Sequence, residues 1–411
     1  MVLAAAAILF FQAAAAPKTA TTNASADGIK ALDEGRYNDA AQIFRQAIVS
    51  DSSDYSAHFN LALADSFLGN DDDGIQEYRK VLELKPGLYE AQLNLGILLL
   101  RQKRPAEAKP LLDAAAAQKP GEFRPRFYLA EAELANNSPA EALENYRAAA
   151  GLDPKSAAAQ LGIAHSLAAQ NKPDDAAPYF QKAAQLDPRY QTSLAELAAI
   201  YEKSGRKSEA IALYRQFPND PAAQEHLGQL LLDTKQYSDA VPALEAAYTK
   251  APTAANRVGL AMAYLFTQQE DKALPLLDKS VADDPANFDL RIMYAHALRD
   301  KKQYRSAADQ FTAALKLKPD AAHTWDELGG VLYLAEDYQP ALGAFERAHQ
   351  LGENTAGNWF LRAIILDKFH QLKPALEAYR QFLALSDNKN PNQEWQARQR
   401  ERILQKELDR K

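Results

Sequence analysis

The chain has 411 residues, of which 47% are hydrophobic and 25% are charged, and its formal net charge is −7. This acidic balance argues against a nucleic-acid partner, because binding to phosphates requires clustered Lys and Arg. The sequence contains no cysteine, which excludes disulfides, a thiolate nucleophile, cysteine metal ligands and a lipid-modified cysteine.

The chain begins with an uncharged apolar run, residues 1–16, followed by a polar segment, residues 17–25. The run resembles a secretory signal peptide and the polar segment a short linker. The apolar run is shorter than the roughly 20 apolar residues that a transmembrane helix needs, so we expect no stable transmembrane span. The sequence predicts export, to the periplasm, with cleavage after Ala14 or Ala15. Because no Lys or Arg precedes the apolar core, a retained membrane anchor, a cytosolic tail and an upstream start stay open.

A small residue then recurs along the chain, mostly every 34 residues. This series is Gly28, Ala62, Gly96, Ala130, Ala164, Ala198, Gly228, Ala261, Ala295, Gly329 and Ala363. A second small residue, such as Ala40 or Gly74, follows 12 positions later, and a bulky apolar residue, such as Phe44 or Tyr78, follows 4 positions after that. A fixed period in this range indicates a solenoid built from one supersecondary unit.

The unit is a pair of helices. Residues 55–67 and 73–84 have apolar side chains at helical spacing. Gly69, between them, suits the left-handed conformation that ends a helix. Pro86 closes the unit because proline cannot continue a helix. We infer that the recurring small residues lie where two antiparallel helices approach closely, with the bulky residue beside them.

Prolines also occur inside the second helices. Pro105, Pro139 and Pro173 stand at predicted helix starts. The backbone N–H at this position makes no intrahelical hydrogen bond, so its absence in proline costs the helix nothing. A further group stands 5 residues later, and we expect the helices that contain it to begin late or to tilt. This group is Pro110, Pro178, Pro242 and Pro275.

On these residues the chain resembles the tetratricopeptide repeat family, whose small positions, bulky position and closing proline match the series above. The closing prolines are Pro86, Pro120, Pro154, Pro188, Pro252, Pro285 and Pro319, and Trp325 and Trp359 match an aromatic position. The resemblance implies an all-α fold, a right-handed α-solenoid of about eleven helix-turn-helix repeats. They begin near 21, 55, 89, 123, 157, 191, 221, 254, 288, 322 and 356, and the last two close on Glu353 and Asp387 instead of Pro.

The repeats divide into two predicted regions, 21–217 and 221–387, because the interval drops from 34 to 30 between Ala198 and Gly228. The two prolines in Phe217–Pro221 cannot both lie in a helix interior, which predicts an early helix end and a hinge near Asn219. The remaining residues, 388–411, are predicted to form a capping helix. Its apolar candidates for contact with the last repeat are Trp395, Ile403, Leu404 and Leu408.

Motifs for chemistry are missing from the sequence. The 7 histidines occur singly, without the HExxH or i, i+4 pair that places two imidazoles on one helix face. No glycine-rich phosphate loop or Ser/His/Asp arrangement occurs. We therefore expect a protein that is not an enzyme and has no catalytic residue, metal or cofactor.

The resemblance also implies a binding groove, since first helices of this family line a concave surface. The positions carried over are Phe59, Leu63, Phe67, Leu93, Ile97, Leu100, Arg124, Phe127 and Leu134. An apolar groove predicts a socket for a helix or an extended peptide, in which Asn60 and Asn94 could contact the peptide backbone. Alternatively, neighbouring repeats cover these side chains. Of the residues with which some family members bind a C-terminal carboxylate, only Arg124 is matched.

The predicted function is a protein-interaction scaffold or adaptor for a protein or peptide partner whose identity the sequence does not give. The alternative is a structural subunit of an envelope assembly that contacts its neighbours through the outer face.

Overall fold

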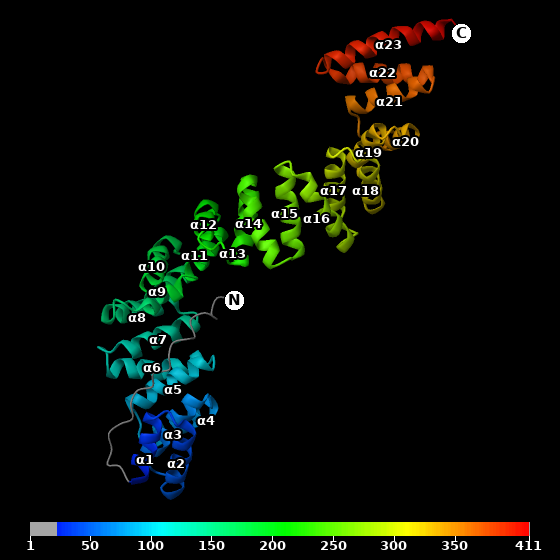
Figure 1. The fold of residues 1–411 in the computed structure, drawn as a ribbon. Coiled ribbons are helices and arrows are strands. Elements are labelled where there is room, and N and C mark those ends of the chain that lie inside the picture. Colours follow the sequence, from blue (N-terminus) through cyan, green and yellow to red (C-terminus); the bar gives the residue numbers. More distant parts are fainter. Residues whose placement is uncertain (1–22, 411) are drawn as a thin grey trace. The chain divides into compact units, whose positions relative to one another are not determined.

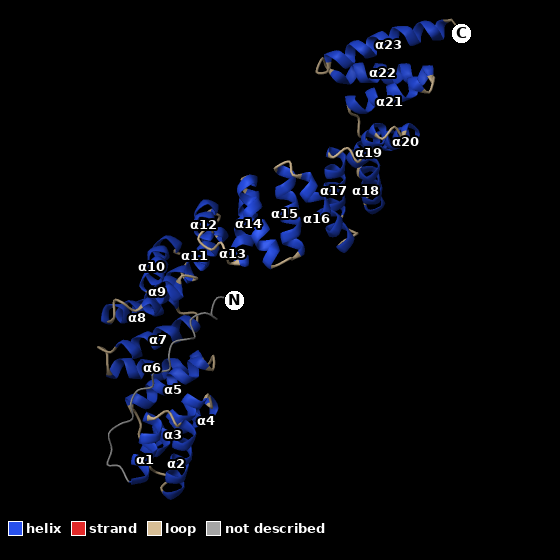
Figure 2. Cartoon of the chain, viewed as in Figure 1, coloured by secondary structure: helices blue, strands red, loops and turns tan. Residues whose placement is uncertain are grey.

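The computed structural model describes residues 23–410, shown in Figures 1 and 2. The predicted signal segment and residues 17–22 lie outside this part. The described chain is α-helical apart from one 3-10 turn, η1 (Pro188–Tyr190), and its connections. Residues 23–25, predicted as linker, instead begin the first helix.

The α-helices form eleven consecutive pairs and one final helix, as the repeat pattern predicted. The pairs are α1 (Asn23–Asp33) and α2 (Tyr37–Ser50), α3 (Tyr55–Leu68) and α4 (Asp71–Leu84), α5 (Tyr89–Arg101) and α6 (Pro105–Gln118), α7 (Phe123–Ala135) and α8 (Pro139–Leu152), α9 (Ala157–Ala169) and α10 (Pro173–Leu186), α11 (Ser193–Lys203) and α12 (Lys207–Tyr214), α13 (Pro221–Asp233) and α14 (Tyr237–Lys250), α15 (Ala254–Phe266) and α16 (Glu270–Asp283), α17 (Phe288–Asp300) and α18 (Tyr304–Leu317), α19 (Ala322–Leu334) and α20 (Tyr338–Gln350), and α21 (Ala356–Lys368) and α22 (Leu372–Ser386); α23 (Pro391–Asp409) follows.

These helices belong to two compact units, one ending at Leu213 and the other beginning at Tyr214. Within each unit, neighbouring helices pack in chain order, and Figure 1 shows the pairs stacked one after another. The fold is therefore an all-α solenoid. α12 ends at Tyr214 and Pro221 is the first residue of α13, so the second helix of this repeat ends early, as predicted. The hinge near Asn219 stays a prediction.

The turn inside each pair uses one left-handed residue at the same place in every repeat. The φ angle is 80° at Gly69 and 60° at Asn137. At Gly69 the turn is closed by a bond from the Asn70 N–H to the Asp65 carbonyl, 2.9 Å long, which satisfies a carbonyl at the helix end. Glycine was therefore a correct sign of the turn, but several repeats form the same turn with Asn, Lys, Gln, Glu or His.

The small and bulky positions pack against each other, as predicted. A Cβ atom added to Gly96 would lie 2.6 Å from Leu112 Cγ, and one added to Gly329 would lie 2.5 Å from Phe345 Cδ1. Both distances are far below van der Waals contact, so the large side chain occupies the space that glycine leaves. This close approach accounts for the repeated small residues.

Pro105, Pro139 and Pro173 are the first residues of their helices, which confirms the prediction. The expectation that helices with a later proline begin late is wrong, because α6 contains Pro110 and still begins at Pro105. Proline's fixed φ is helical, and near the helix start it removes a single N–H bond. The helix tolerates that loss.

The final helix, α23, packs on α22. Leu404 is fully buried, and Leu408 packs against the same cluster, as predicted. The prediction was wrong for Trp395 and Ile403, which are 64% and 42% exposed. Trp395 lies two residues, or roughly 200° of helical rotation, from the buried Ala397, so the two side chains point to opposite faces.

No described helix has the length and the hydropathy needed to cross a membrane.

Candidate partner-binding surface

The predicted groove residues lie on α3, α5 and α7 of the first unit. First helices of successive pairs approach each other directly, α5 to α7 and α7 to α9. They therefore form one layer of the unit, as a groove lined by first helices requires.

Five predicted groove residues lie in the hydrophobic core. Phe59, Leu63, Leu93, Ile97 and Phe127 are all buried, with at most 9% of their surface exposed. The first four belong to a single cluster that spans α3 to α7. For these five side chains the alternative reading holds, because neighbouring repeats cover them. Their role in binding a partner stays a prediction, and in this structure they offer little surface for it.

The other four residues are accessible. Phe67 is 39% exposed, and its ring stacks on that of Tyr37 with 4.7 Å between centroids. Leu100, Leu134 and Arg124 are half-buried. We call Phe67, Leu100, Arg124 and Leu134 the accessible band. Its aliphatic and aromatic members offer apolar surface, and Arg124 adds a positive charge.

The surroundings of Arg124 are polar. Its Nη2 atom is buried and has no hydrogen-bond partner. Nearby, the Tyr89 hydroxyl donates to Glu122 Oε2 over 2.7 Å. This bond chiefly lowers the pKa of Glu122, and the charges of Lys119 and Arg124 lower it further, so Glu122 stays anionic. The guanidinium of Arg124 is therefore incompletely hydrogen-bonded within the protein, and a guanidinium is a donor suited to a carbonyl or carboxylate oxygen.

Asn60 and Asn94 are directed inward. Both are buried; the Asn60 Nδ2 donates to the Ser56 carbonyl over 2.9 Å and the Asn94 Nδ2 to the Tyr78 hydroxyl over 3.2 Å. Neither amide is exposed to bind the backbone of a peptide; both nitrogens donate within the protein, and the Asn60 Oδ1 atom is buried without a hydrogen-bond partner.

Sequence reasoning missed Tyr37, the partner of Phe67. The same stacking recurs in the second unit, where Tyr237 and Phe266 lie 4.1 Å apart between ring centroids. In both cases the tyrosine is the first residue of a second helix, and the phenylalanine is the last or second-to-last residue of the first helix of the next repeat. A search for aromatic pairs at that spacing would have found both.

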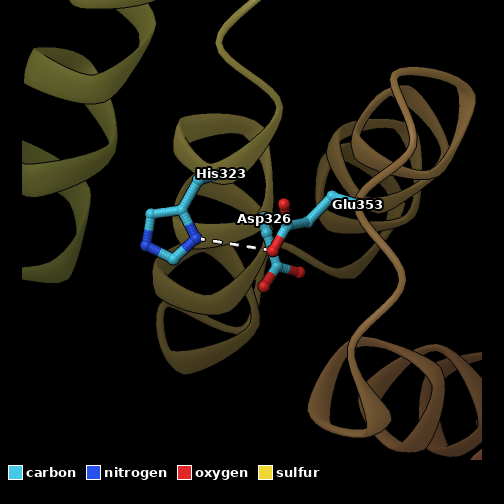
Figure 3. A group of neighbouring side chains, drawn as sticks. All are labelled: His323, Asp326 and Glu353. Atoms are coloured by element: carbon cyan, nitrogen blue, oxygen red, sulfur yellow. Dashed lines mark ion pairs between the residues drawn. The ribbon is translucent and has the colours of Figure 1, made fainter.

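The structure also brings together three possible metal ligands that sequence reasoning missed, His323, Asp326 and Glu353 (Figure 3). The sequence search considered histidine pairs on one helix, whereas here a single histidine meets carboxylates from two segments. Burial chiefly raises the pKa of Asp326, and the charge of Glu353 adds to this effect.

A family profile for the tetratricopeptide repeat matches most of the chain. The matched stretches are residues 26–89, 64–123, 93–157, 161–224, 196–255, 226–288 and 292–356.

Two curated proteins resemble parts of the chain. The human Protein O-mannosyl-transferase TMTC1 is 26% identical over 168 residues, which is 38% of this chain and 19% of that protein. The General transcriptional corepressor ssn6 of Schizosaccharomyces pombe is 26% identical over 129 residues, 31% of this chain and 12% of that protein. The chain thus spans less than a fifth of each relative's length.

Among solved structures, one of MamA AMB-1 is 27% identical with a TM-score of 0.39, covering 41% of this chain and 99% of that one. A structure of MamA 41-end from Desulfovibrio magneticus RS-1 is 22% identical with a TM-score of 0.39, covering 41% and 97% of the two chains.

Proposed function

This chain belongs to the tetratricopeptide repeat family, and we propose that it is a non-enzymatic scaffold or adaptor that binds a peptide or helix of a partner protein. Solenoids of this kind present extended surfaces on which partners bind. The observation that carries the proposal is the accessible band, where apolar side chains lie on the same layer of helices as an incompletely bonded guanidinium. We expect no nucleic-acid partner and no cofactor.

The band suggests what the partner presents. Phe67, Leu100 and Leu134 would contact apolar side chains, as in other cases where a helix or extended segment binds a groove. The half-buried guanidinium of Arg124 would donate a hydrogen bond to a carbonyl or carboxylate oxygen of the partner. The buried core residues beneath would hold the band in place without touching the partner.

Site-specific photo-crosslinking in the producing cell tests the proposal. A crosslinking residue at Phe67 or Leu134 should attach to one or a few proteins that mass spectrometry identifies. The matched control is Leu152, which is 43% exposed and ends a second helix, α8. Substituting Arg124→Gln should reduce the yield at Leu134. Equal products from Leu134 and Leu152, or none from the band, would contradict the groove.

A second candidate function is a structural subunit of an envelope assembly. It is supported by exposed leucines on second helices, Leu152 on α8 and Leu186 on α10. An outer-face subunit should crosslink to large neighbours from these two positions and give no product from Phe67. The same experiment therefore separates the two functions.

We also propose that the protein is exported to the periplasm, on the basis of residues 1–16. The mature protein should begin near Ala15 or Ala16 and be released by osmotic shock. N-terminal sequencing of the native protein would contradict export if it found intact Met1.

A further inference from the structure

Three metal-ligand side chains converge at the junction between the last two repeats. His323 and Asp326 lie on α19, and Glu353 lies in the connection between α20 and α21 (Figure 3). His323 Nδ1 is 3.6 Å from Glu353 Oε1. One ligand atom from each of the three residues lies within 4.8 Å of the others. The three groups are thus preassembled by the fold around one small volume.

The polar groups at this place are incompletely satisfied by the protein. Asp326 Oδ1 is buried without a hydrogen-bond partner, and Oδ2 accepts a long bond, 3.4 Å, from Thr355 Oγ1. Asn358 is 3% exposed, and neither its side-chain nitrogen nor its oxygen makes a hydrogen bond of normal geometry. A weaker interaction of the Asn358 side chain with the Asp326 carboxyl lowers the pKa of Asp326. Because buried polar groups in folded proteins are normally paired, this arrangement points to a missing ligand.

Comparison with other repeats of the same chain shows that packing does not require these residues. The place of Asp326 is taken by Phe59 in the second repeat and by Leu93 in the third. The place of Glu353 is taken by proline in most repeats, for example Pro319 in the one before. This repeat therefore has carboxylates, Asp326 and Glu353, where other repeats have an apolar side chain and a closing proline. Together with His323 they have a composition suited to a cation.

We propose that His323, Asp326 and Glu353 bind one divalent transition-metal ion, of which Zn²⁺ is the representative. Imidazole with carboxylates is a ligand set that Zn²⁺ and its neighbours favour, whereas Ca²⁺ and Mg²⁺ prefer oxygen alone. Two carboxylates neutralise the charge of the ion. Tetrahedral bonds of about 2.1 Å separate ligand atoms by about 3.4 Å, and the His323–Glu353 distance of 3.6 Å already fits this value. An Asp326 carboxylate oxygen lies within 4.8 Å of the other two ligand atoms and would have to move closer to complete the set.

The bound ion would hold the connection that leads into the last repeat against α19. Fewer residues of α20 approach α21 than approach at the equivalent junction of α18 with α19. A metal shared by α19 and the α20–α21 connection adds a link where helix packing is sparse. The His323 side chain is 73% exposed, which leaves the fourth coordination position open to water. Thr355 and Asn358 lie against the Asp326 carboxyl and would orient it toward the ion, as polar neighbours of metal ligands commonly do.

The test uses the full, tag-free chain, freed of metal by chelator and titrated with Zn²⁺ by calorimetry, with the bound metal quantified by mass spectrometry. We expect one ion per chain and at least a tenfold loss of affinity in His323→Ala and in Glu353→Gln. Two control variants should bind as the parent does. Asp387→Asn changes the equivalent closing position of the next repeat, and His296→Ala removes a histidine that pairs with the single carboxylate of Glu327 at 2.7 Å.

Several results would overturn the site. They are absence of saturable binding in the parent chain, parent-like affinity in both ligand variants, or tighter binding of Ca²⁺ or Mg²⁺ than of Zn²⁺. Circular dichroism of the metal-free variants shows whether they fold, so lost binding in a folded variant counts as support. Limited proteolysis adds a separate measurement. Zn²⁺ should slow cleavage within residues 351–355 in the parent and not in Glu353→Gln; equal cleavage with saturated metal would refute the fixing of this connection to α19.

Discussion

One face of α23 is buried and the other is exposed, which predicts different losses of stability for two substitutions on this helix. Leu404→Ala and Trp395→Ala remove apolar side chains from the same helix. Leu404 is fully buried in a cluster with Phe360, Tyr379 and Phe382, whereas Trp395 is 64% exposed. The smaller side chain should therefore cost more stability than the larger one.

The magnitudes follow from burial. Leu404→Ala removes three carbon atoms, worth about 2.4 kcal/mol by transfer, and the remaining cavity brings the cost to about 3 kcal/mol. Only about a third of the Trp395 surface is covered, and allowing for a compact unfolded chain its loss should cost about 1 kcal/mol. The expected difference is thus about 2 kcal/mol.

Native-state hydrogen exchange is the suitable assay, because a solenoid unfolds in parts and a single melting temperature does not report one end of it. Amides of α22 and α23 should exchange about thirtyfold faster in Leu404→Ala than in Trp395→Ala, with α13 and α14 unchanged in both. An equal or larger effect of Trp395→Ala would refute the assignment of the buried face.

Three further predictions concern other parts of the chain. Gly96→Ala should destabilise its repeat by about 1–3 kcal/mol, because the new Cβ overlaps Leu112, and local hydrogen exchange would measure this. Burial raises the pKa of Glu131, which accepts a hydrogen bond from Tyr146. Because the pKa of Glu131 is raised in the folded state, its ionisation destabilises the fold above that raised pKa. Below the ordinary pKa near 4.5 the carboxyl is neutral in both states and has no such effect. Glu131→Gln should therefore raise stability at neutral pH and change little near pH 4. Limited proteolysis should cut first near Asn219, in the exposed connection between α12 and α13.

Each of these has a control or an opposing result. Gly151→Ala, where a Cβ meets nothing within 4 Å, should stabilise its helix by about 0.5–1 kcal/mol; destabilisation at both glycines would show that lost flexibility, and not overlap, is the cause. For Glu131→Gln, a gain that persists at pH 4 would rule out charge burial. First cleavage inside any repeat would argue against a hinge at Asn219.

The sequence by itself determined the repeat architecture. Its period places a small residue, a bulky residue and a turn at the same positions in every unit, and each unit can bury its apolar face only by packing on the next. The helix pairs, the early end of α12 before Pro221 and the final helix could therefore all be predicted. Local rules were sufficient because these features depend on residues close together in the chain.

Tertiary structure decided which side chains remain at the surface. Phe59 and Phe67 are both aromatic residues on α3, yet the first is buried and the second 39% exposed, because the neighbouring repeats cover one position and not the other. The same reason separates Leu404 from Trp395 on α23. Exposure depends on the rotation of each helix against its neighbours, which a hydrophobic pattern specifies only loosely when most positions on the helix are apolar.

The proposed metal site shows the same limit over a longer distance. Spacing on one helix could suggest His323 and Asp326 as a pair, three positions apart. Glu353 reaches them only because the α20–α21 connection folds back beside α19. Convergence of residues from two segments is a property of packing, so the sequence pattern did not indicate this group before the α20–α21 connection was placed beside α19.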